Sequence, residues 1–383
     1  KPNLQGTNWY KEITHVAPLN RISLNFNGGT EAGRFFIGLG AHSQDGVTIG
    51  NSFTRYTVRA NSEWDLRPWL AIGENFQATY RSAKGIEGAN GGIGVADEES
   101  TLLSAFRMPT IIPVKDEFGS YASTKAAGFN NPRNPVRVLD YDRGNDTNFN
   151  INLFGNMYLL FKPIDGLTVR SRLGMQYNNY YYTDYNYKYL GDSEPQASDS
   201  FSEGSGYNFQ WVFTNTAEYE KLFGVHKIKV LGGIEALNTG AGRFINGSGI
   251  NPFSMDTDYV TLNNVDSPQV SSNLYSGVNF YSLFGKVDYN FDERYYVSGV
   301  VRRDGSSRFG ANSRYGVFPA ASAAWRVIAE PFMQNQKVFS DLKVRGGWGQ
   351  MGNSNNVDPN NQYSLYASRK NTTYYPNGGQ CTR

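Results

Sequence analysis

The segment Asn148–Phe161 reads NFNINLFGNMYLLF, and it decides the fold class. Its apolar side chains fall on alternate positions, with asparagines at many of the positions between them. Successive side chains of a β-strand point to opposite faces of the sheet, so this alternation predicts a strand with one apolar and one polar face. The apolar face contains Phe149, Ile151, Leu153, Gly155, Met157, Leu159 and Phe161, and the polar face contains Asn148, Asn150, Asn152 and Asn156.

The same period of two residues recurs on both sides of this segment. It predicts a hairpin over Ile22–Ala41 with a turn at Gly28-Gly29, two strands between Tyr56 and Tyr80, and a strand after the turn at Pro163–Gly166. The further predicted strand pairs are 207–222 with 226–236, 281–291 with 295–304, and 315–326 with 342–351. The pattern predicts roughly twelve strands. Helical turns are predicted only at 102–108 and 330–333.

The connections between the predicted strands alternate between short and long. Three long segments, 81–147, 188–206 and 238–279, carry Gly, Asn, Ser and Pro without an apolar period. Outer-membrane barrels have short turns on the periplasmic side and long loops outside the cell. We therefore predict an all-β fold, a segment of a transmembrane antiparallel β-barrel in which these three segments are extracellular loops and the apolar strand faces contact lipid.

Composition excludes two classes of protein. The chain has 383 residues and a net charge of +2, from 36 basic and 34 acidic residues. This balance lacks the basic surface with which proteins bind phosphates, so we expect no nucleic-acid partner. No run of about 18 apolar residues is present, which excludes a transmembrane helix and leaves a transmembrane β-barrel open.

Two motifs invite a cofactor or metal interpretation. Gly347–Gly352 has the spacing of a dinucleotide-binding fingerprint, but Asn353–Asn356 supplies no helix for the pyrophosphate, so glycines of a barrel strand are favoured. Asp140, Asp142 and Asp146 lack the spacing of a calcium loop, so an exposed acidic turn is favoured and calcium stays an alternative. We expect no cofactor and no catalytic residue.

Two stretches supply candidate ligand contacts. Tyrosines cluster between positions 180 and 189, where their rings either stack on sugars or form the aromatic girdle at the lipid headgroups, and the girdle is favoured near the strand end. Charged residues gather at 302–308, at the tip of a predicted strand. Ion pairing at the base of a loop is the common arrangement at such a place, and contact with a ligand is the alternative. The candidates are Tyr180, Tyr181, Tyr182, Arg302, Arg303, Asp304 and Arg308.

The C-terminal half carries a resemblance to a known family. The stretch YSLFGKVDYNF at 281–291 resembles the barrel of SusC/RagA-type TonB-dependent transporters. RRDGSSRFG at 302–310, GVFPAASAAWR at 316–326 and LKVRGGWGQ at 342–350 follow in the order of that family's strands. The resemblance covers essentially the whole chain. It implies that residues 1–383 are part of a barrel of about 22 strands.

The resemblance also implies a function and partners. It implies TonB-dependent active import of a large nutrient, an oligosaccharide or a peptide, across the outer membrane of a Gram-negative bacterium. The implied partners are a SusD-like lipoprotein lid, to whose contact we expect 81–147 to contribute, the TonB–ExbB–ExbD energy complex and outer-membrane lipid. The sequence leaves the choice between glycan and peptide open.

Other functions stay as alternatives. They are a siderophore or vitamin receptor, a passive porin or adhesin, and an outer-membrane hydrolase, for which no nucleophile motif is present. The family's plug domain, TonB box and final barrel strands are not recognised in these residues, so we expect an internal fragment. An open sheet edge cannot be left in lipid, so we expect its edge strands to pair with further strands of the same polypeptide.

Overall fold

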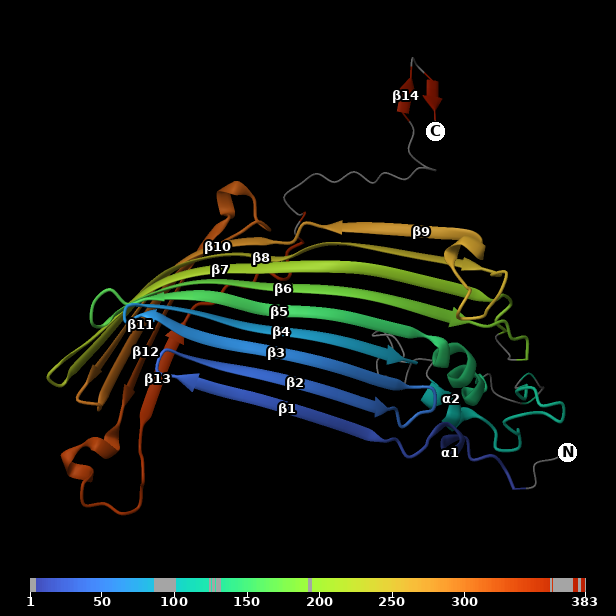
Figure 1. The fold of residues 1–383 in the computed structure, drawn as a ribbon, viewed down its shortest axis with the longest axis horizontal. Helices are drawn as coiled ribbons and strands as arrows, with labels where there is room; N and C mark the ends of the chain where they lie inside the picture. The colour runs from blue at the N-terminus through green and yellow to red at the C-terminus, as the bar shows by residue number, and fades with distance from the viewer. Residues whose placement is uncertain are drawn as a thin grey trace. The chain divides into compact units, whose positions relative to one another are not determined.

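The computed structural model contains one large sheet of thirteen strands within the residues that it describes (Figure 1). Strands that are neighbours in sequence pair with each other, in the order β1 to β8 and then β10 to β13, while β9 pairs with β8. The predicted all-β antiparallel fold is confirmed. The described residues are 5–85, 101–123, 125, 128, 132–191, 195–358, 360, 375–377 and 380–382, with the backbone alone for 142, 143 and everything after 360.

The elements have the following bounds. The strands are β1 (Leu19–Thr30), β2 (Gly33–Asp45), β3 (Ser52–Arg67), β4 (Leu70–Lys84), β5 (Thr147–Phe161), β6 (Leu167–Asn186), β7 (Ser200–Phe223), β8 (His226–Ile250), β9 (Asp266–Tyr275), β10 (Asn279–Phe291), β11 (Tyr295–Ser306), β12 (Tyr315–Trp325), β13 (Val344–Gly349), β14 (Tyr375–Asn377) and β15 (Gln380–Thr382). The short helices are α1 (Trp9–Ile13), α2 (Thr101–Arg107), α3 (Pro135–Arg137), η1 (Val138–Arg143), η2 (Leu262–Asn264), η3 (Ala311–Ser313), η4 (Val327–Ala329) and η5 (Pro331–Met333). None of the helices in the described part of the chain is long and apolar enough to cross a membrane.

The chain divides into two compact units, which are described separately. The first contains Lys1–Leu160, Arg172–Trp211 and Gly240–Gly277. The second contains Phe161–Ser171, Val212–Thr239 and Val278–Arg383. Strands β6, β7 and β8 contribute residues to both units, and so does β5, whose last residue Phe161 belongs to the second unit.

In the first unit, the apolar side chains of β1 to β3 lie exposed on one face of the sheet. Leu24 pairs with Leu39, and Leu39 pairs with Val58, so the register aligns the apolar positions of neighbouring strands. The large apolar side chains of this face are between 41% and 62% exposed: Ile22, Leu24, Phe26, Phe35, Ile37, Leu39, Tyr56 and Val58. A continuous apolar surface of this kind marks an interaction site in a soluble protein, and in an outer-membrane protein it is the surface that contacts lipid.

The other face of the same strands is polar and hydrogen-bonded. Arg34 forms an ion pair with Glu63 at 2.8 Å, and the hydroxyl of Tyr158 donates to the same carboxylate at 2.7 Å. Strand β5 follows the predicted alternation, because Asn150 bonds Asn178 of β6 while the Phe149 ring packs against Tyr181. Phe149 and Asn150 therefore lie on opposite faces of the sheet.

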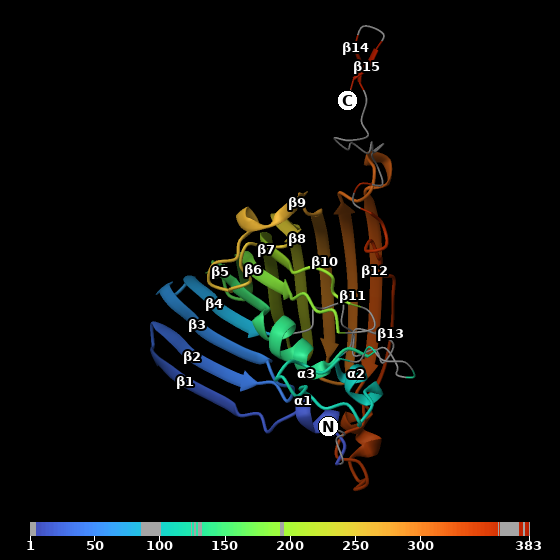
Figure 2. The same ribbon diagram turned by 90° about the vertical axis from the view of Figure 1, so that its right-hand side faces the viewer.

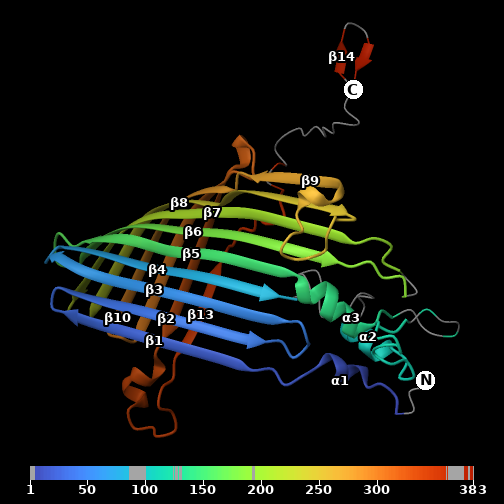
Figure 3. The ribbon, with the colours of Figure 1, turned by 45° about the vertical axis from the view of Figure 1, so that its right-hand side comes forward.

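A small hydrophobic core lies at one end of β1 to β4, where α1, α2 and α3 gather (Figure 3). It contains Trp9, Ile13, Ala105, Met108, Ile112, Ala122 and Leu139, and we refer to it as the lobe core. Asn134 is fully buried beside it, and its side-chain amide donates to the carbonyls of Val114 and Ala122. These bonds satisfy two buried carbonyls, so the irregular loop can pack as a compact body.

The strands extend further into the predicted long loops than the sequence indicates. Strand β7 begins at Ser200, within the predicted loop 188–206, while β8 and β9 occupy much of the predicted loop 238–279. The glycines that favoured a loop permit close strand contacts instead. A Cβ atom on Gly242 would lie 2.0 Å from the carbonyl oxygen of Tyr207. Between β4, which ends at Lys84, and β5, which begins at Thr147, the described residues include α2, α3 and η1.

In the second unit, β8, β10, β11 and β12 form a wall of antiparallel strands, which Figure 2 shows beside β13. The pairing of β10 with β11 runs from Phe280–Ser306 to Phe291–Tyr295, close to the predicted pair. Leu283, Val297, Val301 and Val317 are exposed on one face. The opposite face carries most of the charged side chains.

Candidate functional site

The register of the second unit places three polar residues in one row. Glu235 of β8 pairs with Ser282 of β10, and Ser282 pairs with Asp304 of β11. Since paired residues of neighbouring strands point to the same face, the three side chains lie side by side on the polar face. Ser282 is almost completely buried, at 1% exposure.

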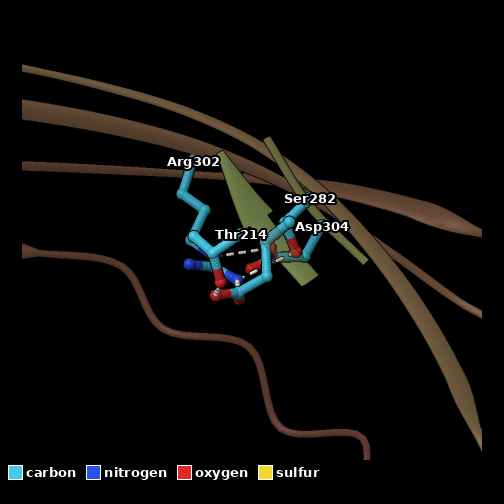
Figure 4. A network of polar contacts seen from close by, with 5 residues as sticks. Thr214, Ser282, Arg302 and Asp304 are labelled. Carbon is cyan, nitrogen blue, oxygen red and sulfur yellow. Dashed lines mark hydrogen bonds and ion pairs between the residues drawn. The ribbon is translucent and has the colours of Figure 1, made fainter. Parts of the chain in front are cut away.

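The guanidinium of Arg302 links the members of this row (Figure 4). Its Nε donates to Asp304 at 2.6 Å, while its Nη2 donates to Glu235 at 2.8 Å and to the hydroxyl of Ser282 at 2.9 Å. The second oxygen of Glu235 accepts from the hydroxyl of Thr214 at 3.1 Å. We call these five residues the Arg302 array.

The array is partly open to a neighbouring cleft of about 380 Å³. The lining includes Phe280, Ser306, Phe309, Arg314, Phe318 and Asn353, together with Arg302 and Asp304. The side chain of Arg302 is 37% exposed, and among the described residues no hydrogen bond uses its Nη1. A guanidinium has five N–H donors, so Arg302 retains donors for a ligand oxygen. One guanidinium faces two carboxylates, so the array carries a net negative charge.

Arg303 and Arg308 lie apart from the array. Arg303 follows Arg302 on β11, so its side chain leaves the opposite face of the strand, and its guanidinium lies 4.1 Å from the centre of the Tyr315 ring. Arg308 donates from Nη1 to the carbonyl of Val357, which fastens the segment after β13 to the loop after β11. The predicted charged group therefore comprises one joined pair, Arg302 with Asp304, and two arginines with separate contacts.

The three candidate tyrosines lie on β6 in the first unit, on two different faces. The hydroxyl of Tyr181 donates to Glu203 at 2.7 Å, and its ring packs against Phe149 on the apolar side. Tyr180 and Tyr182 leave the opposite face, the one that carries Asn178. Their rings lie over Gly206 and Gly204, where a Cβ atom would approach them within 2.8 Å and 2.6 Å. Tyr181 thus lies on the apolar face, where a girdle residue is expected. Tyr180 and Tyr182 lie on the polar face of β6.

Sequence reasoning missed Glu235, Ser282 and Thr214. Glu235 interrupts the apolar run of β8 in LGGIEALN, and this single carboxylate among glycines and aliphatic residues is the signal that could have found it. Its partners depend on the register of three strands, which no local pattern contains.

Two of the three loop aspartates accept hydrogen bonds. Asp140 accepts from the hydroxyl of Tyr121, and Asp146 accepts from the backbone N–H of Tyr185 at 2.8 Å. Burial and this bond to Asp140 hold the pKa of the Tyr121 hydroxyl above its ordinary value, so it stays a neutral donor. The side chain of Asp142 lies outside the described residues. In the described part of the chain, no three acidic, histidine or cysteine side chains come together as a metal site would require.

Comparison with known proteins gives relatives of one kind. No family model matches the chain. The chain is 27% identical to TonB-dependent receptor P26 of Formosa agariphila over 92% of its own length, and 24% identical to TonB-dependent receptor SusC of Bacteroides thetaiotaomicron over 97%. It spans only about a third of these relatives, 34% and 37% of their lengths.

A solved structure agrees with these relatives in fold. The structure of the RagAB peptide transporter superposes on 90% of the chain with a TM-score of 0.72, at 23% sequence identity and over 38% of that protein. The sheet, the exposed apolar faces and these relatives confirm the predicted resemblance and the outer-membrane location. Nearly the whole chain is therefore similar to part of the SusC-type TonB-dependent transporters, and its sheet is a β-barrel segment of the Gram-negative outer membrane.

Proposed function

We propose that the chain forms part of the wall of a TonB-dependent importer that carries a large nutrient, an oligosaccharide or a peptide, across the outer membrane. The observation that supports this proposal is the Arg302 array beside its cleft. Free N–H donors of Arg302 and carboxylate acceptors of Asp304 lie within one cleft that also contains aromatic rings. Hydroxyl and amide groups both donate and accept, so sugars and peptides suit this mixture.

The charges that line the cleft are those of Arg302, Asp304 and Arg314, two positive and one negative. The proposed substrate class therefore rests on the mixture of donors, acceptors and aromatic rings in the lining. Among the relatives, RagAB is described as a peptide transporter, and other relatives are named only as TonB-dependent receptors. We keep both substrate classes in the proposal, and growth on defined nutrients separates them.

The substrate test uses the full-length protein in its own cells. A deletion strain is grown on single oligosaccharides and on size-fractionated peptides as sole carbon source, with and without the TonB complex. We expect growth on one nutrient class to be lost in the deletion strain and in the strain without TonB. Growth that survives loss of TonB would indicate a passive porin.

The role of the array is tested by a pair of adjacent substitutions. Arg302→Gln removes the guanidinium that reaches the cleft, while Arg303→Gln removes its neighbour on the opposite face. We expect the first to lower affinity for the identified nutrient, measured by calorimetry, and the second to leave it unchanged. Heat-modifiable gel migration shows whether each variant folds. If Arg302→Gln does not fold, Arg302→Lys, which keeps the positive charge, is measured in its place.

We further propose that a SusD-like lipoprotein covers the end of the first unit that carries the helices. Tyr10 and Phe106 stack there with ring centres 6.0 Å apart, and both are exposed, as is Phe118. Exposed aromatic residues of this kind mark a protein contact. Phe106→Glu and Phe118→Glu should weaken co-purification with the lipoprotein, while Lys125→Glu, a charged position in the same loop, should not.

A further inference from the structure

The connection between β12 and β13 differs from the other connections at the same strand ends. Residues 31–32, 68–69, 224–225 and 292–294 make short turns, whereas 326–343 form a longer link that contains η4 and η5. Figures 1 and 2 show it as the orange segment beyond the ends of β12 and β13. Short turns mark the periplasmic end of an outer-membrane barrel, so the link lies at that end.

Glu330 fastens the link to the wall. One oxygen of its carboxylate accepts from the hydroxyl of Tyr295 at 2.6 Å and from the indole N–H of Trp325 at 2.9 Å. Arg294 lies 3.7 Å from the other oxygen. The Glu330 carboxylate is buried, and all these partners belong to β12, β11 or the turn before β11.

The rest of the link is folded on itself. The backbone N–H of Ile328 donates to the carbonyl of Leu342 at 3.2 Å, and Arg326 pairs with Asp341 at 3.3 Å. The side chain of Gln336 accepts from the backbone N–H groups of Val338 and Phe339 and donates to the Phe339 carbonyl. The link is therefore an ordered element.

The link packs on the lipid-facing side of the wall. Tyr295 and Trp325 are paired in the register, and their rings are stacked with an angle of 7° between the planes. They share their strand faces with Val297 and Val317, which belong to the exposed apolar surface. The ring of Phe332 contacts Trp325 edge-on, with 6.4 Å between centres. This contact places η5 over the outer, lipid-facing surface at the periplasmic rim.

Held in this way, the link exposes large apolar side chains. Phe332, Val338 and Phe339 are 67%, 83% and 51% exposed. They lie close in sequence to the basic residues Arg326 and Lys337. Aromatic side chains beside cationic ones are the composition of elements that lie at the boundary between lipid headgroups and acyl chains.

We propose that residues 326–343 are a membrane-interface anchor, which lies in the headgroup layer of the periplasmic leaflet with Phe332 directed toward the acyl chains. Lipid is the occupant because the surface under the link is continuous with the apolar wall formed by Val297 and Val317. Lys337 meets the phosphates of the headgroups. The anchor fixes the depth at which β11, β12 and β13 sit in the membrane. This inference rests on the outer-membrane location and is independent of the proposed substrate.

The test places an environment-sensitive NBD fluorophore on the full-length protein in two kinds of membrane. Phe332→Cys and Val338→Cys carry the label, and Glu293→Cys, in the short turn before β11 at the same end, is the matched control. The membranes are bilayers of phosphatidylethanolamine with phosphatidylglycerol, and native outer membranes. Quenchers are a phospholipid with a nitroxide near the headgroup and aqueous iodide.

We expect labels at 332 and 338 in the pure lipid bilayer to show blue-shifted emission, strong quenching by the lipid nitroxide and a severalfold loss of iodide quenching relative to the Glu293 label. Equal iodide quenching at all three positions would overturn the anchor. So would protection from both quenchers that occurs only in native membranes, because it would identify a periplasmic protein as the occupant. Gel migration confirms that each labelled protein is folded.

Discussion

The lobe core and the wall of β8, β10, β11 and β12 both contain large apolar side chains, but these side chains are shielded from water in different ways. Trp9 and Ile13 are 2% and 0% exposed inside the lobe core, whereas Val297 and Val301 are 53% and 54% exposed on the wall. The lobe core is enclosed by protein and the wall surface by lipid. In this chain the apolar residues of the lobe core are irregularly spaced in the sequence, whereas those of the wall alternate along each strand and form one exposed face. Such an alternating face is the surface that an outer-membrane barrel presents to lipid.

The largest expected effect is in the lobe core. Trp9→Ala removes a buried ring and the hydrogen bond from its indole N–H to the Pro109 carbonyl at 3.1 Å. Loss of a buried aromatic side chain costs about 3–5 kcal/mol, so the lobe should open locally while the barrel stays folded. External protease should then cut within 101–123 in whole cells. Lys11→Ala, at an exposed position of the same helix, is the control, and equal cleavage of both variants would contradict an enclosed core.

The next effect concerns the wall, where adjacent residues of β11 face opposite sides. Val301→Arg puts a charge on the lipid face and should cost about 2–4 kcal/mol near the bilayer midplane. Val300→Arg puts the same charge on the polar face and should cost clearly less. The measurement is equilibrium unfolding of both variants in lipid bilayers with urea. If both lose the same stability, the face assignment of β11 is wrong.

A smaller effect is expected when Glu330 is protonated, because only the link is released. The hydrogen bond from Tyr295, then that from Trp325 and the charge of Arg294, hold the pKa of Glu330 below its ordinary value of 4.5. A lowered folded-state pKa means that the stabilisation is complete above the unfolded-state pKa and is lost as the pH falls through the folded-state value. A spin label at Asn335→Cys should therefore become mobile below pH 4.5, and not between neutral pH and that value. In Glu330→Gln the label should be mobile at every pH, and a label that moves at neutral pH in the parent protein would speak against the contact.

The smallest effect is expected at an ion pair on the polar face between β7 and β8. Lys229 and Glu218 lie 2.8 Å apart, with side chains 36% and 32% exposed. Exposed pairs are worth about 0–1 kcal/mol, because solvent screens them. Lys229→Ala should leave the unfolding midpoint nearly unchanged, and the double variant with Glu218→Ala isolates the pair. A coupling free energy between the two residues as large as the cost of Val301→Arg would show that solvent is excluded from this face.

The alternation made most of the fold predictable. The pairs of β10 with β11 and of β12 with β13 could be predicted because apolar and polar residues alternate within each of these strands. The predicted helical turn at 330–333 appears as η5. Strand β9 could not be predicted, because Ser271, Asn273 and its other small polar residues have the composition of a loop. These residues form a strand through their pairing with β8. Arg302 and Asp304 could be named as candidates, but Glu235 could not, because its place beside them is set by hydrogen bonding between distant strands.

Strands β7 and β8 have a mechanical consequence. They contain 24 and 25 residues, while about 9–11 residues of a tilted strand suffice to cross a bilayer. More than half of each strand therefore belongs to a hydrogen-bonded ribbon outside the hydrocarbon, and residues 251–265 connect β8 to β9 at its end. A force along such a ribbon loads many backbone hydrogen bonds at once, so the ribbon resists stretching and yields mainly by bending.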